Sequence, residues 1–309
     1  MNKKSNVKGI PILLTAAFVW GIAFAAQTAG AEHLSAFSYT AIRYAIGVIP
    51  LLPIAYILEI RNRNTEKIKN SLKYGFLGGS IMFVAITLQQ YGIQIIDQAA
   101  KSAGQASDAS GKAGFITCLY ILIVPLLGLI FKRFPSINVW AGVGLAVFGM
   151  YLLTIKESSS IETGDILVFL SAILWAVHIL VVDKFVSKIH AVTFSATQFI
   201  VVSLISTICM LIFDHVTLGA VKNALIPLLY GGLGSVAIGY TLQIVGQKFA
   251  SPVPASLALS MESVFAALAG AIFLKENLGL RGYIGCLLIF IAIVLAQLPE
   301  EWFKLKQKY

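Results

Sequence analysis

The chain has 309 residues, of which 58% are hydrophobic and only 12% are charged, and its formal net charge is +9. Soluble domains carry about 25% charged residues, so this composition excludes a soluble enzyme, a nucleic-acid-binding module and a disordered chain. The apolar residues form long runs instead of alternating ten-residue strands, which excludes an outer-membrane barrel. The remaining class is an all-α polytopic membrane protein, with room for about ten spans of about 20 residues each.

Ten apolar segments follow one another along the chain and predict ten transmembrane helices. They cover residues 10–29, 36–58, 74–95, 113–131, 137–155, 165–182, 191–213, 223–246, 253–274 and 281–299. The first segment follows three lysines, as in a cleaved signal peptide. Its apolar stretch is nearer in length to a full span, so we interpret it as the first helix.

Lysines and arginines are unevenly distributed between the predicted loops. With the N-terminus in the cytoplasm, 16 lie on the cytoplasmic side, 6 lie on the outer side, and Arg43 falls inside the second span. This positive-inside bias predicts a multi-pass protein of the cell (inner) membrane with cytoplasmic N- and C-termini. Because topology explains the basic charge, we expect no nucleic-acid partner.

The two halves of the chain resemble each other. Trp20 matches Trp175, the segment 33–38 matches 190–195, and Leu88-Gln89 matches Leu242-Gln243. The predicted domains are a five-helix repeat over 1–155, a linker over 156–164, a second five-helix repeat over 165–299 and a cytoplasmic tail over 300–309. Since five is odd, consecutive copies have opposite orientations, and such inverted repeats are typical of secondary transporters with a site near the midplane.

Two charged residues lie inside predicted spans, where uncompensated charge is costly. Glu262 is about ten residues into the ninth span, near mid-bilayer at about 1.5 Å per residue. It is the candidate proton carrier, and a structural carboxylate bonded between helices is the alternative. Arg43 could pair with Glu262 or bind a substrate carboxylate, or its side chain could extend to the outer surface.

Aromatic and polar side chains recur at helical spacing in four spans, which predicts that they line a cavity. The aromatic residues would contact the apolar body of a substrate and the glutamines its polar group. The alternatives are ordinary packing and hydrogen bonding between helices, and His178 is a second candidate proton group. The predicted substrate-binding residues are Trp20, Phe24, Arg43, Gln90, Gln94, Trp175, His178, Tyr240, Gln243 and Gln247.

Along nearly its whole length the chain resembles the drug/metabolite transporter superfamily, EamA type. The segments that carry the resemblance are Trp20-Gly21, Arg43-Tyr44, 111–117, 239–243, 251–255, 260–267 and 273–276. The resemblance implies ten helices in two inverted halves, cytoplasmic termini and alternating access to a central cavity. The sequence departs from the family pattern in the extra segment Asp97–Ser110, expected to be a solvated outer loop or a lid, and in Glu262-Ser263, where members have Glu-Pro and a kink.

These features predict a secondary active transporter that exports a small metabolite, such as an amino acid or amine. An intramembrane enzyme and a non-transporting scaffold or receptor are the alternatives. The sequence shows no nucleophile with a base and no cluster of metal ligands, so we expect no catalytic residues, metal or cofactor. The expected partners are the small-molecule substrate, the lipid bilayer and protons, and the glycines that begin the tenth span leave a homodimer open.

Overall fold

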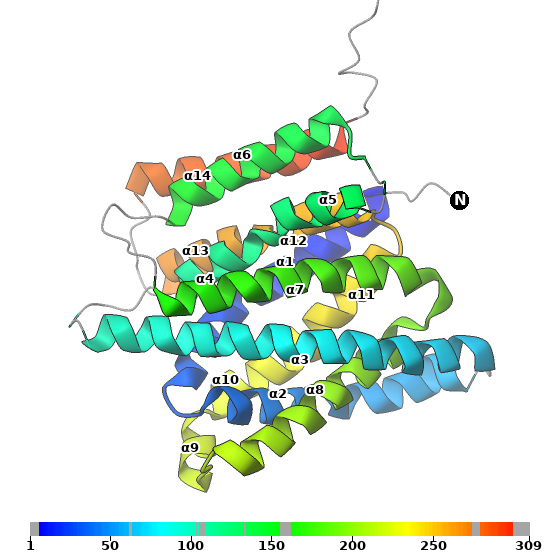
Figure 1. Cartoon of the computed structure of the whole chain (residues 1–309), viewed down its shortest axis with the longest axis vertical. Coiled ribbons are helices and arrows are strands. Elements are labelled where there is room, and N and C mark those ends of the chain that lie inside the picture. The colour runs from blue at the N-terminus through cyan, green and yellow to red at the C-terminus, as the bar shows by residue number, and fades with distance from the viewer. Residues whose placement is uncertain are drawn as a thin grey trace, which may run out of the picture.

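The computed structural model describes residues 6–61, 64–102, 104, 109–130, 132, 134–154, 162–273 and 279–298. Every regular element in these ranges is a helix (Figure 1). The elements of the first half are α1 (Asn6–Ala31), α2 (Ala36–Ala55) with the π-helical turn η1 (Tyr56–Ile60), α3 (Thr65–Ser102), α4 (Ala109–Cys118), α5 (Tyr120–Ile130) and α6 (Ile137–Thr154). The elements of the second half are α7 (Thr163–Phe185) with the turn η2 (Val186–Lys188), α8 (Ala191–Phe213), α9 (Leu218–Asn223), α10 (Leu225–Leu229), the π-helical η3 (Tyr230–Tyr240), α11 (Thr241–Gln247), α12 (Pro252–Leu259), α13 (Met261–Phe273) and α14 (Gly279–Gln297).

Within the described residues, nine helical segments are long and apolar enough to cross a membrane, and the apolar helix Ile137–Leu153 is somewhat shorter. Together they account for the ten predicted spans, so the predicted all-α membrane fold with two five-helix repeats is confirmed. The predicted linker 156–164 falls largely outside the described residues, and the predicted tail 300–309 falls wholly outside them.

The third span is much longer than predicted. Hydropathy marks only its apolar part, 74–95, whereas α3 extends through 38 residues from Thr65 to Ser102. The start of the extra segment Asp97–Ser110, expected to be a loop or a lid, is therefore the last part of this helix. Lys101 forms ion pairs of 2.9 Å with Asp97 one turn earlier and with Glu32 at the end of α1. Residues 103 and 105–108 lie outside the described ranges.

Equivalent spans of the two halves pack on each other at both edges of the bundle. The fifth spans, α6 and α14, form one edge, and the second spans, α2 and α8, form the other (Figure 1). Between these edges α3 packs on α7 and α8, and η3 repeats this arrangement by packing on α1 and α2. A pseudo-twofold relation between inverted repeats predicts this pattern.

The pair α6–α14 depends on two glycines that face each other. A Cβ on Gly285 would lie 2.5 Å from the carbonyl oxygen of Gly149, and one on Gly149 would lie 2.8 Å from that of Gly285. Small residues allow helix backbones to approach this closely. Gly285, one of the glycines considered for contact with a second copy, is thus used within the chain, and the homodimer stays a prediction.

The antiparallel helices α2 and α8 cap each other's N-termini. At the end of the bundle where α1 begins, which we call the basic end, Glu59 accepts hydrogen bonds from the backbone N–H groups of Val192 (3.1 Å) and Thr193 (2.7 Å). At the opposite end, Asp214 accepts hydrogen bonds from the backbone N–H (3.1 Å) and the hydroxyl (2.6 Å) of Ser38. Each carboxylate follows the first residue of its own helix by 23 positions, so the two caps are equivalent under the repeat.

Candidate functional site: a cavity between the two halves

A small cavity of about 40 Å³ lies between the two halves. Its walls come from six of the ten spans. The lining residues are Trp20, Ala23, Phe24, Gln27, Gln89, Thr117, Tyr120, Trp175, Ile179, Ser235, Tyr240, Gln243, Leu259 and Glu262. The six spans are the first, third and fourth spans of the first half and the equivalent spans of the second half. The two repeats therefore contribute equivalent spans to the cavity walls.

Two of these spans are interrupted beside the cavity. The fourth span breaks at Leu119, between α4 and α5, and the ninth span breaks at Ser260, between α12 and α13. The ninth span breaks although Ser263 stands where the family has proline, and the weaker kink expected there stays a prediction. The hydroxyls of Ser256 and Ser260 donate to carbonyls three residues earlier, at 2.9 and 2.8 Å, and such bonds bend helices. Interrupted helices near the midplane are typical of transporter binding sites.

Glu262 joins the two breaks. Its Oε1 accepts hydrogen bonds from the Tyr120 hydroxyl at 3.2 Å and from the Cys118 thiol at 3.3 Å. The side chain is only 3% exposed, and both bonds go to the same oxygen, which leaves Oε2 for another partner. A Cβ on Gly21 would lie 2.8 Å from the carbonyl oxygen of Glu262. The carboxylate therefore lies where helices of both halves meet.

Three aromatic rings form a continuous wall of the cavity. The ring centroids of Trp20 and Tyr240 are 4.6 Å apart, and those of Trp175 and Tyr240 are 5.6 Å apart with an interplanar angle of 20°. The Trp20 indole N–H donates to the carbonyl oxygen of Ser235 at 3.3 Å. This bond attaches α1 to η3, a π-helical segment of a kind often found at functional sites.

The structure brings together six of the residues predicted from sequence. Trp20, Phe24, Trp175, Tyr240, Gln243 and the candidate proton carrier Glu262 all line the cavity. The other predicted residues are buried or partly buried beside it but do not line it: Arg43, Gln90, Gln94, His178 and Gln247.

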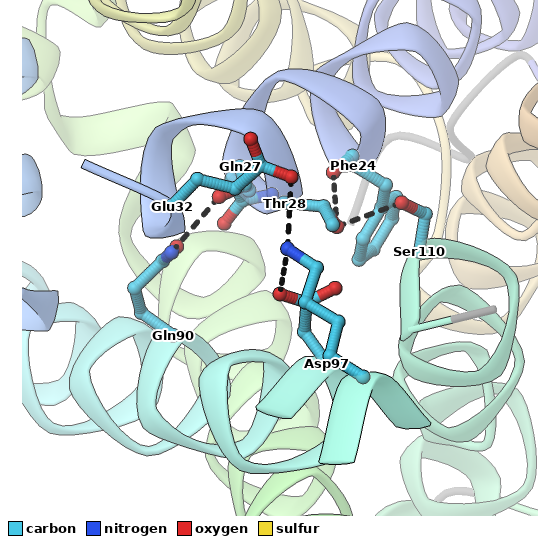
Figure 2. A network of polar contacts seen from close by, with 8 residues as sticks. Phe24, Gln27, Thr28, Glu32, Gln90, Asp97 and Ser110 are labelled. Atoms are coloured by element: carbon cyan, nitrogen blue, oxygen red, sulfur yellow. Dashed lines mark hydrogen bonds and ion pairs between the residues drawn. The ribbon is translucent and has the colours of Figure 1, made fainter. Parts of the chain in front are cut away.

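The glutamines outside the cavity lining bond helices together. Gln94 donates to the carbonyl oxygen of Leu34 at 2.9 Å, and Gln90 donates to that of Gln27 at 3.2 Å. Figure 2 shows the bond between Gln90 and Gln27 near Glu32 and Asp97, the two acids that pair with Lys101. The same view contains the hydrogen bond of 2.7 Å between Thr28 and Ser110. This network fastens α1, α3 and α4 between the cavity and the opposite end. In the second half, Gln247 donates to the carbonyl oxygen of Ile179 at 3.0 Å.

Arg43 is 1% exposed and does not extend to a surface. Its guanidinium carbon lies 5.0 Å from the ring centroid of Tyr39 and 5.2 Å from that of Tyr44. Its Nε and Nη2 have no hydrogen-bond partner within the described parts of the chain. The ion pair with Glu262 considered from the sequence is not formed, because Glu262 bonds to Tyr120 and Cys118 instead.

His178 is fully buried behind the aromatic wall. Its Nε2 lies 3.0 Å from Oε1 of Gln198 on α8, and its ring meets that of Trp175 edge to face at 5.9 Å. The imidazole thus supports Trp175 from behind, and its predicted proton role stays a prediction.

The substrate-binding set predicted from sequence omitted several polar residues that line the cavity. Gln89 donates a hydrogen bond to the Thr117 hydroxyl at 2.9 Å. It lines the cavity, whereas the predicted residue Gln90 does not. The repeat contained the signal, because it matches Gln89 with Gln243. Helical spacing could also have predicted Gln27, because it lies on the same helical face as Trp20 and Phe24. Thr117, Tyr120 and Ser235 lie at the interruption of the fourth span or in η3, which hydropathy does not show.

A second hollow lies at the basic end, away from the central cavity. Its lining residues are Lys67, Asp183, Val186, Ser187, Ile189 and Lys248. Burial lowers the pKa of Lys248, and the charge of Lys67 acts in the same direction. Because the hollow has no aromatic wall and touches only the helix ends, the central cavity is the better candidate for the functional site.

Comparison with known proteins identifies the fold and the family. The sequence matches the EamA-like transporter family over residues 7–155 and 162–298. The chain belongs to the EamA-like transporter family. It is 23% identical over 287 residues to an uncharacterized transporter of Archaeoglobus fulgidus, covering 93% of this chain and 84% of that protein.

Two further comparisons agree with this family. The uncharacterized transporter YoaV of Bacillus subtilis is 23% identical over 294 residues, which cover 91% of this chain and 94% of YoaV. A solved crystal structure of a protein that is 16% identical in sequence superimposes with a TM-score of 0.76. The superposition covers 97% of this chain and 99% of the other chain. The family and its relatives point to an EamA-like transporter rather than an enzyme.

Proposed function

We propose that the protein is a secondary active transporter that exports a small metabolite, such as an amino acid or amine, by alternating access. The substrate binds in the central cavity, against the wall of Trp20, Trp175 and Tyr240. Glu262 takes up and releases the proton that is exchanged for substrate. We place the protein in the cell (inner) membrane with both termini in the cytoplasm, on the distribution of lysines and arginines.

One observation carries this proposal: two interrupted helices, one from each half, meet at a cavity that holds a buried carboxylate. An uncompensated carboxylate inside a membrane is costly, so its position needs a function. A purely structural bundle needs neither the two interruptions nor an interior carboxylate. The pseudo-twofold packing allows two equivalent arrangements of one half against the other, as alternating access requires.

The residues divide into two groups by contact. Trp20, Phe24, Trp175, Tyr240 and Gln243 face the cavity and contact the substrate. Gln90, Gln94, His178 and Gln247 bond to neighbouring helices, and Arg43 lies against the Tyr39 and Tyr44 rings outside the cavity lining.

Counterflow in proteoliposomes tests the proposal. Purified protein is reconstituted with a panel of amino acids, amines and organic acids, with and without a pH gradient. We expect exchange of at least one class, and accumulation driven by the pH gradient in the wild type but not in Glu262→Gln. Glu66→Gln, an exposed carboxylate of α3 at the basic end, is the matched control and should behave as wild type.

Two results would contradict the proposal. Absence of counterflow with every compound would remove the transport function. Full pH-driven accumulation in Glu262→Gln would remove the proton role. Efflux from preloaded cells that express the wild type tests the direction, and uptake in place of efflux would reverse it.

A further inference from the structure

We propose that the central cavity selects an organic cation, an amine with a flat apolar body, over the corresponding zwitterionic amino acid. This inference rests on the proposed transport function, because it takes the cavity as the substrate site. It is carried by the charges, the hydrogen-bonding atoms and the aromatic faces of the cavity walls.

The cavity walls are acidic. Among the described residues that line the cavity, Glu262 is the one acid, and none is a lysine, arginine or histidine. Both hydrogen bonds to Glu262 end on Oε1, so Oε2 is available to an ammonium group. A charge pair in a site shielded from water is much stronger than in bulk water, so the uncharged walls amplify the preference for a cation.

Neutral acceptors in the cavity point to the same ligand. The Gln243 side chain donates its N–H to Oε1 of Gln247 at 3.2 Å, which fixes the amide so that its own oxygen is the free atom. That oxygen and Oε1 of Gln27 are buried and have no partner among the described residues. Buried acceptors without partners are costly, and an ammonium group has three N–H donors to satisfy them.

The aromatic wall suits both parts of such a ligand. Trp20, Tyr240 and Trp175 form one surface with centroid separations of 4.6 and 5.6 Å. Aromatic faces attract cations, by about 0.5–2 kcal/mol for each contact, and they pack well against flat apolar groups.

A substrate carboxylate finds no matching charge in this cavity. Arg43 is the nearest candidate, but its guanidinium is stacked between Tyr39 and Tyr44 and does not line the cavity. The indole N–H of Trp175 is a neutral donor and cannot balance a charge. An amino acid would therefore bring its carboxylate close to Glu262 without compensation, which disfavours it relative to the amine.

Binding measurements with matched pairs of compounds test this inference. The purified wild-type protein in detergent is titrated with radiolabelled tryptamine. Competition is then measured with tryptamine, tryptophan and indole-3-propionate, which share the indole ring and differ in charge. We expect tryptophan to compete at least tenfold more weakly than tryptamine, and indole-3-propionate not to compete.

Two variants test the residues that carry the inference. Glu262→Gln should weaken tryptamine binding at least tenfold, and Gln243→Leu should weaken it severalfold, which keeps the test decisive if one variant fails to fold. Glu66→Gln is the matched control for loss of a carboxylate outside the cavity and should bind as wild type.

The inference is overturned if tryptophan competes as well as tryptamine, if tryptamine does not bind, or if neither cavity variant weakens binding. Failure of the proposed function is separate from these outcomes. Tryptamine binding without counterflow would support the cation site and contradict the transport function. Counterflow of amino acids but not of amines would support the transport function and contradict the cation preference.

Discussion

The close approach of α1 to α13 depends on one residue, Gly21. A Cβ at this position would lie 2.6 Å from the Cβ of Phe265 and 2.8 Å from the carbonyl oxygen of Glu262. Both are atoms that can move only with their helix. Gly21 therefore sets the distance between the two helices that bring Trp20 and Glu262 to the same cavity.

Gly21→Ala should destabilise the protein by about 1–3 kcal/mol, because the added methyl group forces the helices apart. Gly144→Ala on α6 is the matched control, since a Cβ there meets nothing within 4 Å. It should be neutral or slightly stabilising, because alanine favours a helix by about 1 kcal/mol over glycine. The measurement is thermal unfolding in detergent followed by size-exclusion chromatography. Equal melting temperatures for the two variants would show that α1 does not approach α13 this closely.

The reciprocal caps of α2 and α8 are the clearest sign of symmetry among the elements. Glu59 binds the N-terminus of α8 through Val192 and Thr193. Asp214 binds that of α2 through Ser35 and Ser38. A carboxylate at a helix N-terminus satisfies free N–H groups and opposes the helix dipole, so each cap stabilises the contact between the halves.

Glu59→Ala and Asp214→Ala should each cost about 0.5–2 kcal/mol of stability. Because the caps lie at opposite ends of the bundle, the losses should add in the double variant. Thermal unfolding of the two single variants and the double variant measures this, with Glu66→Ala as an exposed control. A double variant no less stable than either single variant would contradict the two independent caps.

The sequence alone predicts the elements better than their interruptions. Hydropathy locates the spans, and helical spacing places Trp20, Trp175, Tyr240 and Gln243 on faces that do reach the cavity. The breaks at Leu119 and Ser260 lie inside uniformly apolar runs. They depend on which backbone hydrogen bonds are lost, and hydropathy contains no such information. Tyr120 and Thr117 were missed for this reason.

At the scale of the whole molecule, the orientation in the membrane rests on the distribution of basic residues. Single cysteines in exposed positions test it: Asn223→Cys in α9 at the opposite end and Lys69→Cys in α3 at the basic end. In intact cells, a membrane-impermeant maleimide should label Asn223→Cys and not Lys69→Cys, because the positive-inside rule places the basic end in the cytoplasm. The wild type, whose Cys118 is buried and whose Cys209 and Cys286 are half-buried, gives the background. The reverse labelling pattern would show that the chain has the opposite orientation in the membrane.

Alternating access requires a substrate cavity between the two halves that opens to each side of the membrane in turn. The most direct test is the reactivity of Ser235→Cys, a cavity-lining position that is only 3% exposed. The reagent is a small cationic methanethiosulfonate, applied from either side of oriented proteoliposomes. Ser206→Cys, at a position that is 0% exposed and outside the cavity lining, is the control.

We expect Ser235→Cys to react from both sides, to be protected by the transported compound, and to shift its reactive side when the substrate gradient is reversed. Ser206→Cys should stay unreactive throughout. Reaction of Ser235→Cys from one side only, whatever the gradient, or no protection by substrate, would contradict alternating access through this cavity.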